Sequence, residues 1–285
     1  MQTILVTGSQ GQLGNEMQQA ANRFPSFNYI YTDIAELDIC DKAALNSFVK
    51  SNKVSVIVNC AAYTAVDKAE TDIDLCNKIN RDAARNIGEV ASENQLKVVH
   101  VSTDYVFDGT NYTPYTEEME VCPATMYGKS KLAGEQALMN SCNQAVILRT
   151  AWLYSAFGNN FVKTMMRLGT ERDSLNVIFD QIGSPTSAAD LADAILTILS
   201  HKEFIPGIYH YSDEGVCSWY DFTKTIHRMS GISCDVHPIE TKDYPAPTPR
   251  PHYSVLNKAK IKATYGIKIP HWEDSLEKCI TILKS

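Results

Sequence analysis

VTGSQGQLGNE, residues 6–16, places Gly8, Gly11 and Gly14 directly after a short aliphatic run, Thr3–Thr7 (TILVT). Glycines in such a position permit a tight turn, let backbone N–H groups approach an anion, and let the next helix pack close to the strand. A tight turn without any ligand would use the same residues. Because we expect a strand before the loop and a helix after it, we interpret the stretch as a dinucleotide-binding loop.

Short aliphatic runs alternate with helical patterns through the first half of the chain. Runs rich in Val and Ile are typical of strands buried on both faces, and their alternation with helices predicts an α/β fold with a Rossmann-type, doubly wound parallel sheet. We expect a dinucleotide-binding domain over residues 1–150 and a smaller, mainly substrate-binding lobe over 151–285, with some later segments returning to the sheet. The expected strands are Thr3–Thr7, Tyr29–Thr32, Val54–Asn59, Lys97–Val101, Ala145–Leu148 and Gly207–Ser212, and the expected helices are Gln12–Asn22, Lys42–Ser51, Asp74–Asn94, Thr125–Ser141, Asn160–Thr170, Ala188–His201, Trp219–Met229 and Trp272–Leu283.

The composition argues against several classes of protein. The net charge of −7 lacks the basic excess that a nucleic-acid partner requires. No run approaches the ~20 apolar residues of a membrane span, and the N-terminus has no basic region that would indicate a secretory signal. The eight cysteines are scattered without a C-x-x-C pair, so we expect reduced thiols in a cytoplasmic protein and no bound metal.

Further residues at strand ends are candidates for contact with the cofactor. Asp33 follows the second expected strand, where a carboxylate accepts hydrogen bonds from the adenosine ribose, although a turn or helix-capping aspartate would look the same. Asp38 and Ile39 could lie against the adenine. Ala61 and Ala62 are small enough for close backbone approach to the cofactor, or simply for close packing. The DIAE segment that starts at Asp33 has no cation for a 2′-phosphate, which favours NADH but leaves NADPH open.

A hydroxyl, a phenol and an ammonium group follow the fourth expected strand. Thr103 ends it, and Tyr127 and Lys131 lie four residues apart, one turn along the same helix face. This set suits hydride transfer to a carbonyl, whose alkoxide must then be protonated. A phenol with its ordinary pKa of ~10 is a poor acid near neutrality. We expect Lys131 to lower the pKa of Tyr127 and to hold the nicotinamide ribose, with Thr103 orienting the carbonyl. Alone, a Tyr–Lys pair is better explained by a solvated helix face, on which such pairs are common.

Together, the glycine loop, the strand-end hydroxyl and Tyr-x-x-x-Lys resemble the extended short-chain dehydrogenase/reductases. Longer blocks spread along the whole chain are similar to the dTDP-4-dehydrorhamnose reductase family within that group. These blocks are Gly11–Gly14 (GQLG), Asn59–Glu70 (NCAAYTAVDKAE), Ser102–Gly109 (STDYVFDG), Tyr127–Glu135 (YGKSKLAGE), Leu148–Tyr154 (LRTAWLY), Gly158–Phe161 (GNNF) and Arg250–Leu256 (RPHYSVL).

The resemblance implies NADPH- or NADH-dependent reduction of the C4 ketone of dTDP-4-dehydro-L-rhamnose to dTDP-L-rhamnose, with Tyr127 as proton donor. It leaves a monomer or a homodimer open. Taken alone, Trp152 would be a core aromatic and Arg250 a surface residue of a proline-rich loop. The implied cofactor contacts are Gly8, Gly11, Gln12, Leu13, Gly14, Asp33, Asp38, Ile39, Ala61, Ala62, Tyr63, Tyr127 and Lys131, and the implied substrate contacts are Thr64, Val66, Thr103, Asp104, Tyr127, Trp152, Asn160 and Arg250.

Two other functions stay open at this point. One is a non-catalytic, dinucleotide-binding regulatory subunit, such as the regulatory subunit of methionine adenosyltransferase, which uses a related scaffold. The complete set of Thr103, Tyr127 and Lys131 argues against it. The other is an epimerase or dehydratase of another nucleotide sugar. A dehydratase would need a second acid after Asp104, where this chain has Tyr105.

Overall fold

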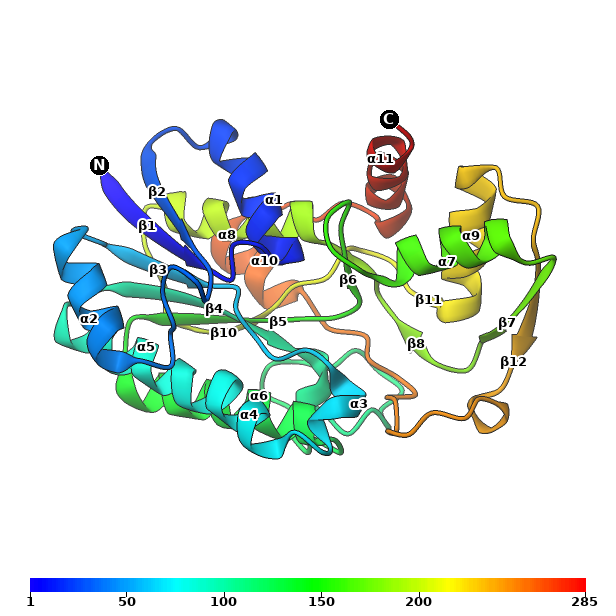
Figure 1. Cartoon of the computed structure of the whole chain (residues 1–285), viewed down its shortest axis with the longest axis horizontal. Helices are drawn as coiled ribbons and strands as arrows, with labels where there is room; N and C mark the ends of the chain where they lie inside the picture. Colours follow the sequence, from blue (N-terminus) through cyan, green and yellow to red (C-terminus); the bar gives the residue numbers. More distant parts are fainter.

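A computed structural model of residues 1–285 places a parallel sheet between two layers of helices, with a smaller lobe beside it (Figure 1). The sheet consists of β1 (Gln2–Thr7), β2 (Phe27–Thr32), β3 (Val56–Asn59), β4 (Lys97–Thr103), β5 (Ala145–Thr150) and β10 (Gly207–His210). Its order is β2-β1-β3-β4-β5-β10, and every neighbouring pair is parallel. The order reverses between β1 and β3. Open sheets of this kind bind ligands beyond the carboxyl ends of the strands at such a reversal.

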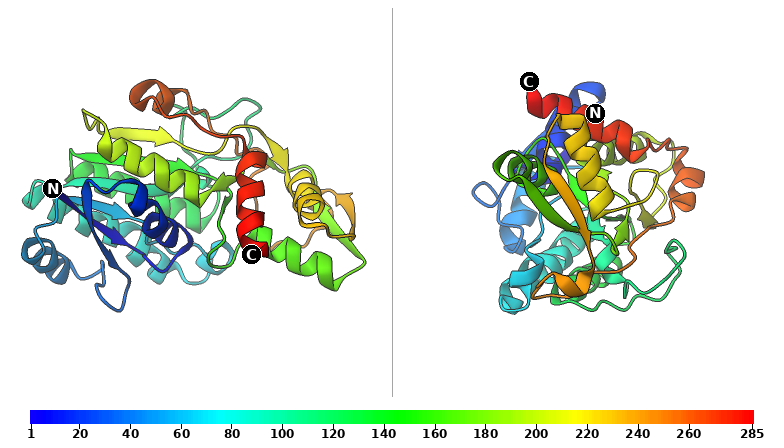
Figure 2. Two further views of the ribbon diagram at one scale, coloured as in Figure 1. Left: turned by 90° about the horizontal axis from the view of Figure 1, so that it is seen from above. Right: turned by 90° about the vertical axis from the view of Figure 1, so that its right-hand side faces the viewer.

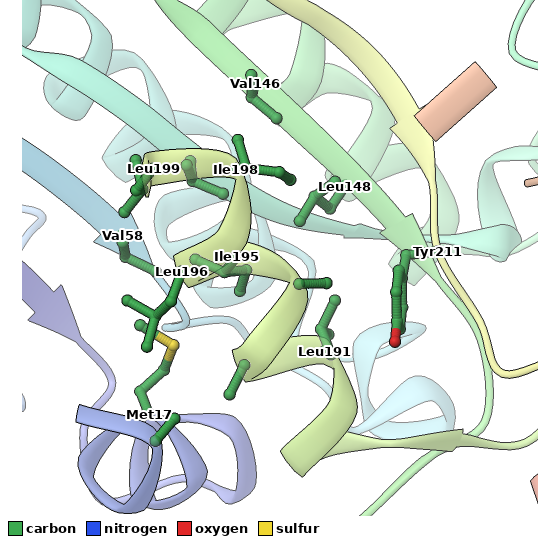
Figure 3. Close-up of a cluster of buried hydrophobic side chains, with 14 of the residues drawn as sticks. Met17, Val58, Val146, Leu148, Leu191, Ile195, Leu196, Ile198, Leu199 and Tyr211 are labelled. Carbon is green, nitrogen blue, oxygen red and sulfur yellow. The ribbon is translucent and has the colours of Figure 1, made fainter. Parts of the chain in front are cut away.

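Strand residues alternate between two apolar cores. Ile4 and Val6 of β1 belong to one cluster and Leu5 to the other, since successive side chains of a strand face opposite sides of the sheet. Figure 3 shows the first cluster, in which side chains of α8 lie between Met17 of α1 and the sheet. The first face is covered by α1 (Gln12–Ala20), α8 (Ala188–Ser200) and α10 (Ala259–Tyr265), and the second by α2 (Lys42–Ser51), α5 (Ala83–Glu93) and α6 (Met126–Ser141).

The smaller lobe stands at one end of the sheet, as the views in Figure 2 show. Its own core includes Phe222, Ile226, Trp272 and Leu276. Its helices are α7 (Phe161–Glu171), α9 (Trp219–Ser230) and α11 (Trp272–Lys284). Three two-stranded ladders complete it: β6 (Leu153–Tyr154) with β9 (Thr186–Ser187), β7 (Ser174–Ile178) with β12 (Asp235–Ile239), and β8 (Ile182–Gly183) with β11 (Cys217–Ser218).

The predicted Rossmann-type parallel sheet is confirmed, and one predicted helix is wrong. The segment Asp74–Asn94 is not a single helix, because a π-helical turn, Lys78–Asp82, separates α4 (Ile73–Asn77) from α5. This turn lies against α6, where a Cβ on Gly134 would come within 2.1 Å of the Asn80 carbonyl oxygen. Close contact between the two backbones therefore accompanies the break.

Elements that the sequence did not predict are short. They include α3 (Val66–Ala69), α10 and the ladders of the smaller lobe. All eight cysteines are free. No helix combines the length and the apolar character needed to cross a membrane.

Candidate active site

The glycine loop lies at the reversal point of the sheet and is closely packed. Gly8 has φ +65°, and a Cβ there would come within 2.7 Å of the Ala61 backbone. A Cβ on Gly14 would come within 2.3 Å of the Gly8 carbonyl oxygen. Helix α1 starts at Gln12 without a side-chain cap or an acidic residue in its first turn. Its first N–H groups are therefore available for an anion, as binding of a pyrophosphate requires.

The acidic residue after β2 contacts the glycine loop directly. The Asp33 carboxylate accepts a hydrogen bond from Gln10 N at 3.0 Å, and Glu36 accepts one from Asp33 N at 2.8 Å. Asp38 accepts one from the backbone of Cys40 at 2.9 Å. Ile39 is buried in the second core, so its side chain packs beneath the segment that follows β2.

Leu13, expected to face the pyrophosphate, is also buried. Its side chain is 5% exposed and belongs to the first core. Any contact between Leu13 and the cofactor must therefore come from its backbone N–H. Gln12, by contrast, is partly exposed, and its side chain accepts a hydrogen bond from Asn160 of the smaller lobe at 3.0 Å.

A buried chain of hydrogen bonds crosses the three adjacent strands β1, β3 and β4. Thr7 donates to the Asn59 side chain at 2.7 Å, and the same oxygen accepts from Ala61 N at 3.2 Å. The Asn59 amide nitrogen lies 2.9 Å from Nδ1 of His100. Burial, and secondarily the charge of Lys131, hold the pKa of His100 well below its ordinary value, so this imidazole is neutral. The chain fixes the backbone at Ala61, against which Gly8 packs.

Tyr63 is held at its backbone by the π-helical turn. Asn80 accepts from Tyr63 N at 2.9 Å and donates to its carbonyl oxygen at 3.1 Å, while the Tyr63 hydroxyl donates to Asp72 at 2.8 Å. Thr64 is exposed beyond it, and Val66 begins α3. Sequence reasoning missed Asn80, because its role depends on the interruption of the helix.

The predicted catalytic side chains meet where β4 ends and α6 begins. Thr125 caps α6 by accepting from Gly128 N at 3.0 Å, which places Tyr127 in the first turn and Lys131 one turn later. The Lys131 side chain is buried, and its Nζ donates to the carbonyl oxygen of Val101 at 2.7 Å. Burial lowers the pKa of Lys131 to about 8, against the opposing charge of Glu135.

The pKa of Tyr127 shifts in the direction opposite to our expectation. Burial raises it above the ordinary value; an interaction with Thr103 acts to lower it, and Asp104 adds to the rise. The predicted decrease is therefore not found, because the Lys131 ammonium is directed to the carbonyl of Val101 and desolvation of the phenol dominates. A phenol with a raised pKa is protonated at neutral pH, as a proton donor must be.

Thr103 and Asp104 form a buried pair beside the phenol. The Thr103 hydroxyl donates to Asp104 Oδ1 at 2.9 Å and accepts from Tyr105 N at 3.2 Å. The second carboxylate oxygen, Oδ2, is buried without a partner. Burial raises the pKa of Asp104 to about 7, only partly offset by its hydrogen bonds.

We predict that Asp104→Asn reduces the dependence of stability on pH. An acid whose pKa rises on folding stabilises the native state below its unfolded pKa of 3.8, and that stability is lost as pH increases through about 7. The melting temperature of the wild type should therefore fall more steeply than that of the variant between about pH 4 and pH 8. Thermal unfolding at several pH values measures both slopes, with the exposed Asp74→Asn as control. Equal slopes for wild type and Asp104→Asn would contradict the prediction.

Trp152 joins the sheet to the smaller lobe in a strained conformation. Its φ is +48°, which is rare for a bulky residue. Its ring stacks on Trp219 at a centroid distance of 3.5 Å and an interplanar angle of 8°. A Cβ on Gly183 would lie 2.5 Å from the Trp152 ring. Trp152 is partly exposed, so it is neither a fully buried core residue nor a free surface one.

Arg250 reaches from the proline-rich loop to α3. Its NH2 group donates to both carboxylate oxygens of Asp67 at 2.8 Å, while NH1 is buried without a partner. Tyr105 and Thr125 line a small cavity beside it. The structure therefore places Arg250 beside Tyr105 and Thr125, each two residues along the chain from a predicted catalytic residue, and pairs it with an acid that the sequence had not singled out.

Comparisons of the whole chain with known proteins give one consistent result. The family model described as "RmlD substrate binding domain" matches residues 1–285. A dTDP-4-dehydrorhamnose reductase of Sinorhizobium fredii is 38% identical over 289 residues, which cover 98% of this chain and 97% of that protein. A crystal structure of a dTDP-4-dehydrorhamnose reductase from Clostridium acetobutylicum has a TM-score of 0.95 and 43% identity, covering 99% of this chain and 100% of that one. The dTDP-4-dehydrorhamnose reductase of Bacillus anthracis, in complex with NADP, gives a TM-score of 0.95 and 38% identity with the same coverage.

Proposed function

The chain belongs to the RmlD substrate binding domain family and is an NAD(P)H-dependent oxidoreductase, and on this premise we propose that it reduces the C4 ketone of dTDP-4-dehydro-L-rhamnose to dTDP-L-rhamnose. The observation that supports the proposal best is the position of Thr103, Tyr127 and Lys131. All three lie at the carboxyl end of β4 or the start of α6, on the edge of the sheet where the glycine loop lies.

Tyr127 is the proton donor in this proposal. A bound nicotinamide dinucleotide supplies the hydride, and the oxygen of the reduced carbonyl takes the phenolic proton. The raised pKa of Tyr127 keeps that proton in place until the alkoxide, a far stronger base, develops. Thr103 lies beside the phenol, and its hydroxyl orients the carbonyl by exchanging its bond to Asp104 for one to the substrate. Lys131, one helical turn from Tyr127, supplies a positive charge close to the phenol.

The two parts of the chain supply different parts of the substrate site. Trp152 follows the end of β5, where Thr150 pairs with Thr103 of β4, and we assign it to the deoxysugar together with Thr64 and Val66. Arg250 has a second guanidinium nitrogen free of protein partners, which suits a phosphate oxygen. Asn160 donates a hydrogen bond to Gln12. It therefore links the smaller lobe, which we assign to the sugar, to the glycine loop, which we assign to the cofactor.

Measured oxidation of NADH and NADPH with the dTDP-linked ketosugar tests the proposal, with the UDP-linked sugar as comparison. We expect stoichiometric oxidation with the dTDP compound and slower turnover with the UDP compound. Binding of the cofactor without oxidation in the presence of any nucleotide ketosugar would favour a regulatory subunit instead. Net epimerisation without net oxidation would favour an epimerase.

A further inference from the structure

A buried ionic network lies directly behind the predicted catalytic pair. Glu135 follows Lys131 by one turn of α6 and Tyr127 by two turns, and its side chain is 2% exposed. Its carboxylate accepts hydrogen bonds from Arg149 Nε at 2.9 Å and NH2 at 2.7 Å, and from the Ser102 hydroxyl at 2.5 Å. Ser102 of β4 and Arg149 of β5 are register partners. One carboxylate therefore joins α6, β4 and β5 next to the predicted site.

The network is built around the carboxylate rather than around the guanidinium. Both oxygens of Glu135 accept hydrogen bonds, whereas Arg149 has one nitrogen, NH1, buried without a partner. The guanidinium carbon lies 5.1 Å from the centroid of the Phe107 ring. Buried ion pairs of this kind contribute little net stability compared with apolar residues of similar volume. Stability alone therefore gives no reason for a carboxylate at position 135.

We propose that Glu135 is a positioning residue for the reaction: its carboxylate fixes the middle of α6, one turn beyond Lys131, against the ends of β4 and β5, and its negative charge keeps Lys131 protonated beside Tyr127. This inference rests on the proposed function, because it concerns the same Tyr–Lys pair. It adds a residue that acts through Lys131 and does not touch the substrate.

The surroundings of Lys131 leave Glu135 as its main ionic support. From β4, the ammonium faces the carbonyl of Val101, to which it donates, and the neutral imidazole of His100. From α4 it faces the thiol of Cys76, and from its own helix the neutral phenol of Tyr127 and the carboxylate of Glu135. Burial lowers the pKa of Lys131 to about 8, and Glu135 is the first of the groups that oppose this decrease. Without that negative charge, Lys131 should lose its proton at a lower pH.

The test removes both charges of the network together, so that no single buried ion is left behind. In Glu135→Met/Arg149→Met, two apolar side chains replace the pair, which generally preserves folding. We expect a folded protein whose activity falls on the alkaline side at a lower pH than in the wild type, because Glu135, one helical turn from Lys131, carries the charge that opposes the loss of its proton. The matched control is Glu273→Met/Arg228→Met, an exposed ion pair of the same residue types between α11 and α9. This control variant should show the wild-type dependence of activity on pH.

Single substitutions at Glu135 separate the effect of its charge from that of its shape. Glu135→Gln keeps the shape and loses the charge, and should shift the alkaline limit downward. Glu135→Asp keeps the charge, and should retain the wild-type limit even where its turnover is lower. A folded Glu135→Gln or Glu135→Met/Arg149→Met protein with the wild-type limit would overturn the proposal.

A second readout keeps this inference separate from the proposed function. Wild-type protein that fails to reduce the dTDP-linked ketosugar would refute the proposed function and leave the role of Glu135 measurable by NADH binding. Lys131 is assigned to the nicotinamide ribose, so NADH affinity should weaken with increasing pH. In fluorescence titrations of NADH at several pH values, the loss of affinity should occur at a lower pH in the variants that lack the Glu135 charge. Coincident curves for these variants and the wild type would refute the role of Glu135 as well.

Discussion

Tyr127→Phe is expected to lower kcat by about 10²–10⁴-fold, the usual contribution of a positioned general acid. The substitution removes only the phenolic oxygen, and the ring keeps its edge-to-face contact with Tyr105, at 5.5 Å between centroids. The fold and the cofactor site should therefore remain intact. Single-turnover oxidation of bound NADH by the ketosugar measures the chemical step, and fluorescence titration measures NADH affinity, which we expect to change by less than about threefold.

The control for this prediction is Tyr220→Phe, the same chemical change on α9 in the smaller lobe. It should turn over at the wild-type rate. If Tyr127→Phe also retained near-full turnover, another group would have to donate the proton, and the proposed mechanism would be wrong.

Gly14→Ala is expected to prevent tight cofactor binding and to destabilise the protein. A Cβ at this position would lie 2.3 Å from the Gly8 carbonyl oxygen and 2.5 Å from Ser9 Cα, so backbone atoms must move. Overpacking of this kind costs about 1–3 kcal/mol, and the contact with backbone places Gly14 at the upper end. A loop displaced by that free energy should bind NADH about 100-fold more weakly. Fluorescence titration and thermal unfolding measure the two effects.

Gly11→Ala is the matched control, because it lies in the same loop with much more space. A Cβ there would meet only the Gly8 carbonyl oxygen, at 3.3 Å, and the backbone of Gly11 is already extended. We expect its effect on NADH affinity to be at least about tenfold smaller than that of Gly14→Ala. Comparable losses in the two variants would show that any side chain in the loop blocks the cofactor, and that close helix–strand packing at Gly14 is not the reason.

The sequence predicted those features that depend on local pattern. Helix α2 has the predicted limits, Lys42–Ser51, since its apolar positions recur with helical spacing and Asp41 caps it. The glycine loop was equally predictable, because its three glycines must fit between a strand and a helix. The ladders β6–β9 and β8–β11 were not, since two residues per strand carry no periodicity.

Features that depend on distant contacts could not be predicted. The raised pKa of Tyr127 comes from burial, which the four-residue spacing to Lys131 does not report. The role of Glu135 depends on Arg149, which the fold brings to it from a neighbouring strand. Similarly, nothing in the proline-rich loop indicates that Arg250 pairs with Asp67, 183 positions away.

The positions of α8, β10 and α10 late in the chain affect folding during synthesis. The face of the sheet that α8 and α10 cover cannot be buried while only the first half of the chain has left the ribosome. At ~5–20 residues per second, that apolar surface stays exposed for seconds of translation, a period in which nascent chains aggregate or recruit chaperones. Truncations that end before residue 188 should accordingly be insoluble, even though they contain every residue of the glycine loop and the Tyr–Lys pair.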